Sequence, residues 1–183
     1  MASTTPARGF RAAGLGSAIA ALLFLSGMAT AQESTNRVAA NTDWSVFVES
    51  DPTECWVVSG PKETVNTRDG RVVAVRRGDI RLFVTYRPGA NVAGEVSFTG
   101  GYPFRNGSTV SVEIGDTTFE LFTDGEWAWG ASPADDARMI TAMKRGTDAK
   151  VTAVSSRGTQ TADTFSLFGF TAATEEAEKR CAR

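Results

Sequence analysis

The chain of 183 residues contains no histidine and only two cysteines. Without histidine, the Ser-His-Asp and Cys-His arrangements of nucleophilic enzymes are excluded. The histidine-containing zinc sites are excluded for the same reason. Neither the phosphate-binding P-loop motif nor the dinucleotide-binding glycine motif occurs. The sequence therefore predicts a protein that is not an enzyme, with no catalytic residues, no metal ligands and no cofactor.

Long apolar runs are also missing, apart from one near the start. Arg8 and Arg11 precede a short apolar segment, residues 12–27, and Ala29-Thr30-Ala31 stands before Gln32. This order of features is typical of a secretory signal peptide. We expect a signal peptide over residues 1–31, cleaved between Ala31 and Gln32, and no transmembrane segment in the mature chain. The predicted location is the periplasm, with secretion or association with the outer membrane as alternatives.

A large excess of basic charge is absent from residues 32–183. Without Arg8 and Arg11, seventeen basic residues face twenty-one acidic ones. Proteins that bind nucleic acids or anionic membranes need a basic surface that neutralises phosphates. We therefore expect neither a nucleic acid nor an anionic membrane surface as a partner. The remaining 152 residues suit one domain with a substantial core.

Two cysteines are too few for a disulfide-rich scaffold, but they suffice for one bond. Cys55 precedes the apolar run 56–59, which reads as a strand, and Cys181 ends a segment with helical periodicity. In an oxidising compartment an even pair of cysteines is normally bonded. We predict a disulfide between Cys55 and Cys181 that ties the last helix to the start of the domain.

The middle of the chain is a series of short segments in which apolar and polar residues alternate. This period of two is typical of strands that are buried on one side, and Asp-Gly and Asn-Gly pairs between them are typical of hairpin turns. Arg77-Gly78-Asp79 is interpreted as such a tight turn. Beyond the short run 56–59, the predicted strands are 44–50, 71–77, 80–88, 94–100, 108–115, 117–123, 150–156 and 164–170.

Two helices complete the predicted fold. The first covers 132–146, with Ser132 as N-cap and Pro133 in the first turn, and the second covers 169–181. The fold class is mostly β: an antiparallel β-sandwich or barrel-like single domain with one middle helix and a C-terminal helix. We expect a flexible lead-in over 32–43 and the domain over 44–183.

Several fragments in order carry a resemblance to a known family. They are Trp44, Gly101–Arg105, Ala128-Trp129, residues 142–146 and residues 155–173. With these fragments the chain resembles the invasion associated locus B family of exported bacterial proteins. The resemblance implies a periplasmic or envelope-associated protein with a compact β-sandwich domain. The resemblance implies no molecular activity for this chain, although the family is named after a role in host-cell entry. Many relatives have a second cysteine pair before the middle helix, which this chain lacks.

The absence of catalytic motifs favours a non-catalytic module that binds a protein partner in the envelope. Aromatic and arginine side chains dominate the binding energy of protein interfaces. Candidates for such a surface are Arg87 and the loop that contains Tyr102, Phe104 and Arg105.

Two other functions remain open. Trp127 and Trp129 share one face of a strand, where they either pack in the core or form a stacking platform for a cell-wall glycan or another small ligand. A hydrolase that works without histidine would rest on acids alone; Asp135 and Asp136 are adjacent, but their place in the first turn of a helix favours a capping role. In addition, an exposed sheet edge would allow a second copy of the chain to pair as a homo-oligomer.

Overall fold

The alternating segments pair into one antiparallel sheet of twelve strands, with the order β1-β2-β3-β6-β7-β10-β9-β8-β11-β12-β4-β5. The computed structural model describes Met1, residues 36–51 and residues 53–182. The strands are β1 (Arg37–Asn41), β2 (Trp44–Ser50), β3 (Thr53–Ser59), β4 (Glu63–Arg68), β5 (Arg71–Val72), β6 (Arg81–Arg87), β7 (Val92–Thr99), β8 (Thr109–Ile114), β9 (Thr117–Asp124), β10 (Trp127–Gly130), β11 (Asp148–Val154) and β12 (Gln160–Ser166). The helices are α1 (Pro133–Met143), α2 (Phe170–Cys181) and a 3-10 turn, η1 (Pro88–Ala90).

The connection between β3 and β4 forces this sheet to curl. The two strands hold the third and eleventh positions of the sheet, yet only residues 60–62 join Ser59 to Glu63. A link of this length spans at most about 14 Å. In a flat sheet, eight strand spacings of about 4.8 Å would separate the two strands by about 38 Å. The far end of the sheet must therefore fold back over its first strands.

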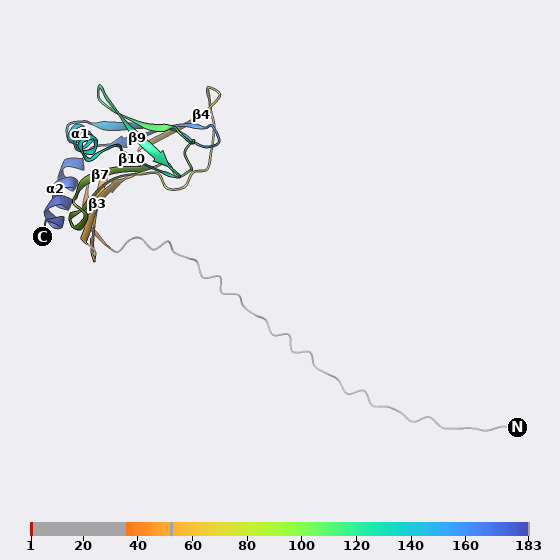
Figure 1. The fold of residues 1–183 in the computed structure, drawn as a ribbon. Coiled ribbons are helices and arrows are strands. Elements are labelled where there is room, and N and C mark those ends of the chain that lie inside the picture. The colour runs from red at the N-terminus through yellow and green to blue at the C-terminus, as the bar shows by residue number, and fades with distance from the viewer. Residues whose placement is uncertain (2–35, 52, 183) are drawn as a thin grey trace. The chain divides into compact units, whose positions relative to one another are not determined.

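Contacts between the two halves of the sheet hold them face to face. The indole nitrogen Nε1 of Trp44 in β2 donates to the backbone oxygen of Ser166 at the end of β12, at 3.0 Å. Phe98 of β7 meets Phe165 of β12 edge to face, with 6.1 Å between ring centroids. The result is two layers with both helices at the same end (Figure 1). The sheet does not close, because β1 and β5 remain as its edges.

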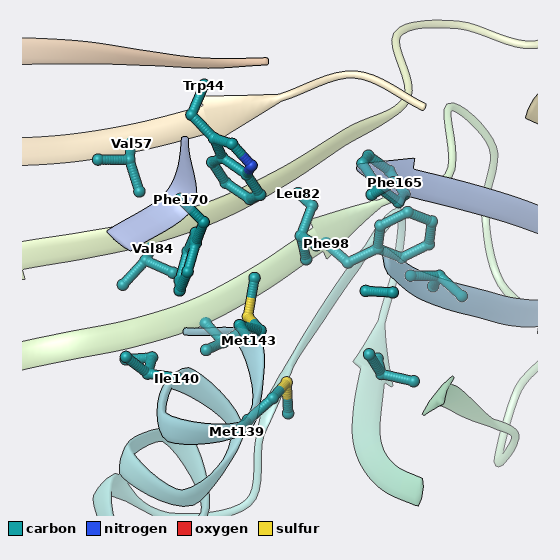
Figure 2. Packing of buried hydrophobic residues seen from close by; sticks show 14 of the residues in the cluster. Trp44, Val57, Leu82, Val84, Phe98, Met139, Ile140, Met143, Phe165 and Phe170 are labelled. Carbon is teal, nitrogen blue, oxygen red and sulfur yellow. The ribbon is translucent and has the colours of Figure 1, made fainter. Parts of the chain in front are cut away.

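The core lies between the layers and under the helices. Val110, Val112 and Ile114 alternate along β8 and are all buried, as their sequence pattern predicts. Figure 2 shows Met139 and Met143 of α1 pointing from the helix into the same cluster, which also contains Phe170 of α2. Phe170 packs edge to face on Trp44, with 4.8 Å between centroids. Each helix thus contributes an apolar stripe to one continuous core.

The mostly β fold with antiparallel strands and two helices is confirmed, and the two halves of one sheet provide the predicted sandwich layers. Ser132 caps α1 as predicted, because its hydroxyl accepts from the backbone N–H of Asp135. The predicted flexible lead-in is partly wrong, since residues 37–41 form the edge strand β1. The predicted strand 71–77 is also too long: β5 ends at Val72, and residues 73–80 run on without strand pairing.

The predicted signal peptide and its cleavage site, Ala31–Gln32, lie outside the residues that the structure describes. Neither α1 nor α2 is long and apolar enough to cross a membrane.

A disulfide joins Cys55 of β3 to Cys181 at the end of α2, as the sequence predicts. Cys55 is fully buried and Cys181 is nearly so. The bond closes a loop with a sequence separation of 126 residues. In the chain-entropy treatment, a loop of this size stabilises the folded state by about 5 kcal/mol. The bond fastens α2 over β2 and β3, against which the helix packs.

Residues 73–80, here called the crossing segment, lead from β5 at one edge of the sheet to β6 near its other end. A buried ion pair holds this segment in place. The guanidinium of Arg77 donates from Nη1 and Nη2 to the two carboxylate oxygens of Asp163, at 2.8 and 2.6 Å. Its Nε donates to the backbone oxygen of Gly100 at 2.8 Å. The side chains of Arg77 and Asp163 are only 6% and 0% exposed. Since a guanidinium matches a carboxylate in this two-pronged geometry, the pair connects the crossing segment to β12 and to the end of β7.

The backbone beside this pair requires glycine at residue 101. Gly101 has φ of +71°, a conformation that side chains with a Cβ rarely adopt. A Cβ there would also lie 2.5 Å from the backbone oxygen of Gly78, whose N–H donates to the backbone oxygen of Gly101. Arg77-Gly78-Asp79 is therefore not the tight turn that the sequence suggests. These residues form neither a turn nor a bend, and Gly78 lies against Gly101 in the loop after β7.

We expect Asp163→Asn to lower the free energy of unfolding by about 3–5 kcal/mol, because it leaves the Arg77 guanidinium buried without a counter-charge. The matched control is Arg138→Gln, which removes an exposed arginine that pairs with Asp135 on α1 and should cost less than about 1 kcal/mol. Urea denaturation followed by circular dichroism measures both. Equal losses in the two variants would contradict the importance of the buried pair.

Candidate functional site

Six aromatic side chains lie on the outer face of the sheet, on β2, β3, β6, β10 and the adjoining β9, on the side away from the core. Their positions follow from strand alternation, because each neighbours a buried residue along its strand. Trp127 is 39% exposed and Phe122 is 48% exposed, while the others are half-buried. The six, here called the outer-face aromatics, are Phe47, Trp56, Phe83, Phe122, Trp127 and Trp129.

The outer-face aromatics form two groups of touching rings. Phe47 and Trp56 stack at 5.4 Å between centroids, with an angle of 3° between their planes. In the second group, Trp127 contacts Phe83 at 5.7 Å and Trp129 at 6.3 Å. Phe122 extends this group by its contact with Trp129 at 5.6 Å. Such contacts hold the rings in defined orientations.

A groove of about 390 Å³ lies between the two groups. Its walls include Trp56 on one side and Phe83, Trp127 and Trp129 on the other. The groove exists because the strands between the rings carry small hydroxyl residues. Strand pairing places Thr85 opposite Trp56, and Ser97 opposite both Phe83 and Trp129.

Charged side chains line one end of the groove. Arg87 pairs with Glu95 at 2.7 Å and with Glu54 at 3.5 Å. Glu49 lines the same end. These carboxylates outnumber the single arginine, so the groove combines flat apolar rings with hydrogen-bond acceptors and a slight negative charge. It is suited to an uncharged or weakly cationic ligand that has both apolar faces and hydroxyl or amide donors.

The structure separates the side chains that the sequence groups into one protein-binding surface. Arg87 lies on the outer face and lines the groove. Phe104 is buried at 4% exposure and packs against Phe98, so it offers no surface contact. Tyr102 is half-buried and its hydroxyl bonds that of Thr161 at 2.5 Å. Arg105 is exposed in the following turn.

Trp127 and Trp129, by contrast, lie together on the outer face and both line the groove. Sequence reasoning missed Trp56 and Phe83 as their neighbours. Only the register of β3, β6, β7 and β10 brings these four rings around one groove.

A buried carboxylate of α1 lies against β7. Asp136 is 5% exposed, and its Oδ1 accepts from the backbone N–H of Val96 at 3.1 Å. Burial raises the pKa of Asp136 to about 6, against the effect of the Val96 hydrogen bond and with a smaller contribution from Glu95. Gly130 allows this approach, because a Cβ there would lie 2.2 Å from Asp136 Oδ1.

Each of the adjacent acids Asp135 and Asp136 has a structural partner. Asp136 is engaged by Val96, and the neighbouring Asp135 bonds the N-cap hydroxyl of Ser132. Within residues 36–51 and 53–182, no three potential metal-ligating side chains lie together.

Comparisons with known proteins show the family through a family model and the fold through a solved structure. Residues 44–178 match the family model described as invasion associated locus B (IalB) protein. The crystal structure of invasion associated protein B from Bartonella henselae is similar, with a TM-score of 0.54 and 16% identity. The match covers 79% of this chain and 98% of that one, and at this identity it supports the fold alone. No curated protein matches the chain.

We expect Asp136→Asn to raise Tm at pH 7 and to leave it nearly unchanged at pH 4. The pKa of Asp136 is about 6 in the folded state against 3.8 without the fold, so its contribution to stability falls as pH rises between these values. Asparagine avoids that loss and can still accept from Val96. Each kcal/mol corresponds to about 2–4 °C in Tm at this size.

The neighbouring variant Asp135→Asn is the control, because its Tm at pH 7 should change in the opposite direction. Hydrogen bonds from Ser132 and Arg138 lower the pKa of Asp135, so its contribution is present at neutral pH and is lost on acidification. Asp135→Asn should therefore lower Tm at pH 7 and converge with the unmodified protein at low pH. Parallel Tm profiles from pH 4 to 7 for Asp136→Asn and the unmodified protein would contradict the raised pKa.

Proposed function

Because the chain belongs to the invasion associated locus B family, whose name states no reaction, we propose that it is an exported, non-catalytic binding module that holds a cell-wall glycan. The groove between the outer-face aromatics is the binding site in this proposal. The single observation that carries it is the grouping of Trp56, Phe83, Trp127 and Trp129 around a floor of hydroxyl residues.

A carbohydrate chain matches the chemistry of this groove. Sugar rings present apolar C–H faces, which stack on aromatic rings, and hydroxyl or acetamido groups, which donate hydrogen bonds. Trp127 and Trp129 offer adjacent ring faces with an angle of 23° between their planes. Glu54 and Glu95 offer carboxylate acceptors at the end of the groove. The glycan would thus lie across β3, β6, β7 and β10.

The grouping of the rings favours a glycan over a protein partner. Protein interfaces depend on anchors that enter a pocket of the partner, and two of the expected anchors are engaged elsewhere, with Phe104 in the core and Tyr102 bonded to Thr161. The outer-face aromatics are instead mostly half-buried side by side and form a shallow, partly polar groove.

Export to the bacterial envelope is part of the same proposal. The Cys55–Cys181 bond needs an oxidising compartment to form and persist. The periplasm provides that compartment, and it is also where the cell-wall glycan is accessible.

The test is binding of the purified protein to peptidoglycan sacculi and to soluble oligosaccharides released from them. We expect Trp127→Ala to weaken binding at least tenfold, which corresponds to about 1.4 kcal/mol. Thr85→Val, which removes a floor hydroxyl and keeps the shape, should weaken it less. Phe168→Ala is the matched control, because Phe168 is 62% exposed and lies outside the groove.

Co-sedimentation with sacculi and calorimetry with oligosaccharides measure these affinities. Equal binding by Trp127→Ala and Phe168→Ala would overturn the groove as the site. If the unmodified protein ignores sacculi and is instead crosslinked in cells to an envelope protein through Phe122, the ligand is a protein and the glycan proposal is wrong.

A further inference from the structure

A second cavity, of about 450 Å³, lies where β4, the crossing segment 73–80 and the turn after β11 meet. Four arginines line it: Arg68, Arg76, Arg77 and Arg157. Glu126 is the one carboxylate of its lining. This excess of positive charge is unexpected in a chain whose net charge is −2.

Three of these arginines have no counter-ion. Arg77 is neutralised by Asp163. Arg68, Arg76 and Arg157 form no ion pair with any residue of the part of the chain that the structure describes. All three are exposed and line one cavity, so an anion that enters the cavity is attracted by each of them.

Part of the cavity is already organised for such a ligand. Arg68 Nη2 donates to the hydroxyl of Thr159 at 2.6 Å, which orients the guanidinium without cancelling its charge. Thr159 is 4% exposed and its backbone N–H donates to the hydroxyl of Ser155. Tyr102 adds a ring wall that is fixed by Thr161 and by the Arg77 guanidinium, 4.9 Å from the ring centroid.

We propose that this cavity binds a small organic molecule that carries a phosphate group. A phosphate brings up to two negative charges and three strong acceptor oxygens, which suits several guanidiniums around one space better than a single carboxylate does. The volume exceeds that of a free phosphate and falls in the range of small-molecule sites. Val75 and Pro103 in the lining would contact the carbon part of the ligand.

This site is separate from the outer-face groove, with which it shares no lining residue. The two proposals can therefore fail independently: loss of glycan binding says nothing about the arginine cavity, and the reverse holds as well.

The experiment is calorimetry with four probes at low salt: glucose 6-phosphate, inorganic phosphate, citrate and glucose. We expect glucose 6-phosphate to bind more tightly than inorganic phosphate, and glucose not to bind. Arg68→Gln/Arg76→Gln/Arg157→Gln should weaken binding of glucose 6-phosphate at least tenfold. The control Arg145→Gln/Lys150→Gln/Lys179→Gln removes the same charge from exposed positions outside the cavity and should change the affinity less than twofold.

Each contrary result overturns a stated part of the proposal. Equal losses in the two triple variants would show that net charge and not the cavity attracts the anion. Citrate binding as tightly as glucose 6-phosphate would show that the ligand class is wrong. If inorganic phosphate binds as tightly as the sugar phosphate, the site holds the free ion and not an organic ligand. No binding of any probe would overturn the site itself.

Discussion

The short connection from β3 to β4 is the constraint on which the rest of the structure depends. It joins the third strand of the sheet to the eleventh through residues 60–62, so the sheet can form only if it curls. The curl turns one sheet into two layers and creates a core between them. It also requires the chain to return from β5 to β6, and the buried Arg77–Asp163 pair holds that return segment against β12. The disulfide then fastens α2 at the same end as the first strands.

Curling leaves the outer face of the first half uncovered, because both helices pack on other surfaces. Strand alternation puts large rings there as well as in the core, and the register places small hydroxyl residues between them. A groove with fixed aromatic walls results, and within the described part of the chain no three potential metal-ligating side chains lie together. The same return segment that completes the fold also brings Arg76 and Arg77 next to Arg68 and Arg157, so the second cavity is a consequence of the crossing.

Local patterns made much of the fold predictable. Val110, Val112 and Ile114 alternate clearly, Ser132 precedes a helix in the usual way, and two cysteines leave one pairing. β4 was not predicted, because its inner face carries Thr64 and Asn66, which bond Asp163 and Arg77 and leave no apolar alternation. The Arg77–Asp163 pair spans 86 residues of sequence, and the groove depends on the register of four strands. Neither leaves a local signal, so from the sequence only Arg87 and the two tryptophans of β10 pointed to residues of the site.

The most direct measurement is an NMR titration of the four tryptophan indole N–H signals with oligosaccharides released from peptidoglycan. Trp56, Trp127 and Trp129 line the groove, whereas Trp44 is 1% exposed and bonded to Ser166, so it serves as an internal control. The proposed function predicts saturable shifts of the three groove signals and a constant Trp44 signal. Unchanged groove signals at saturating oligosaccharide, or a shift of all four together, would contradict it.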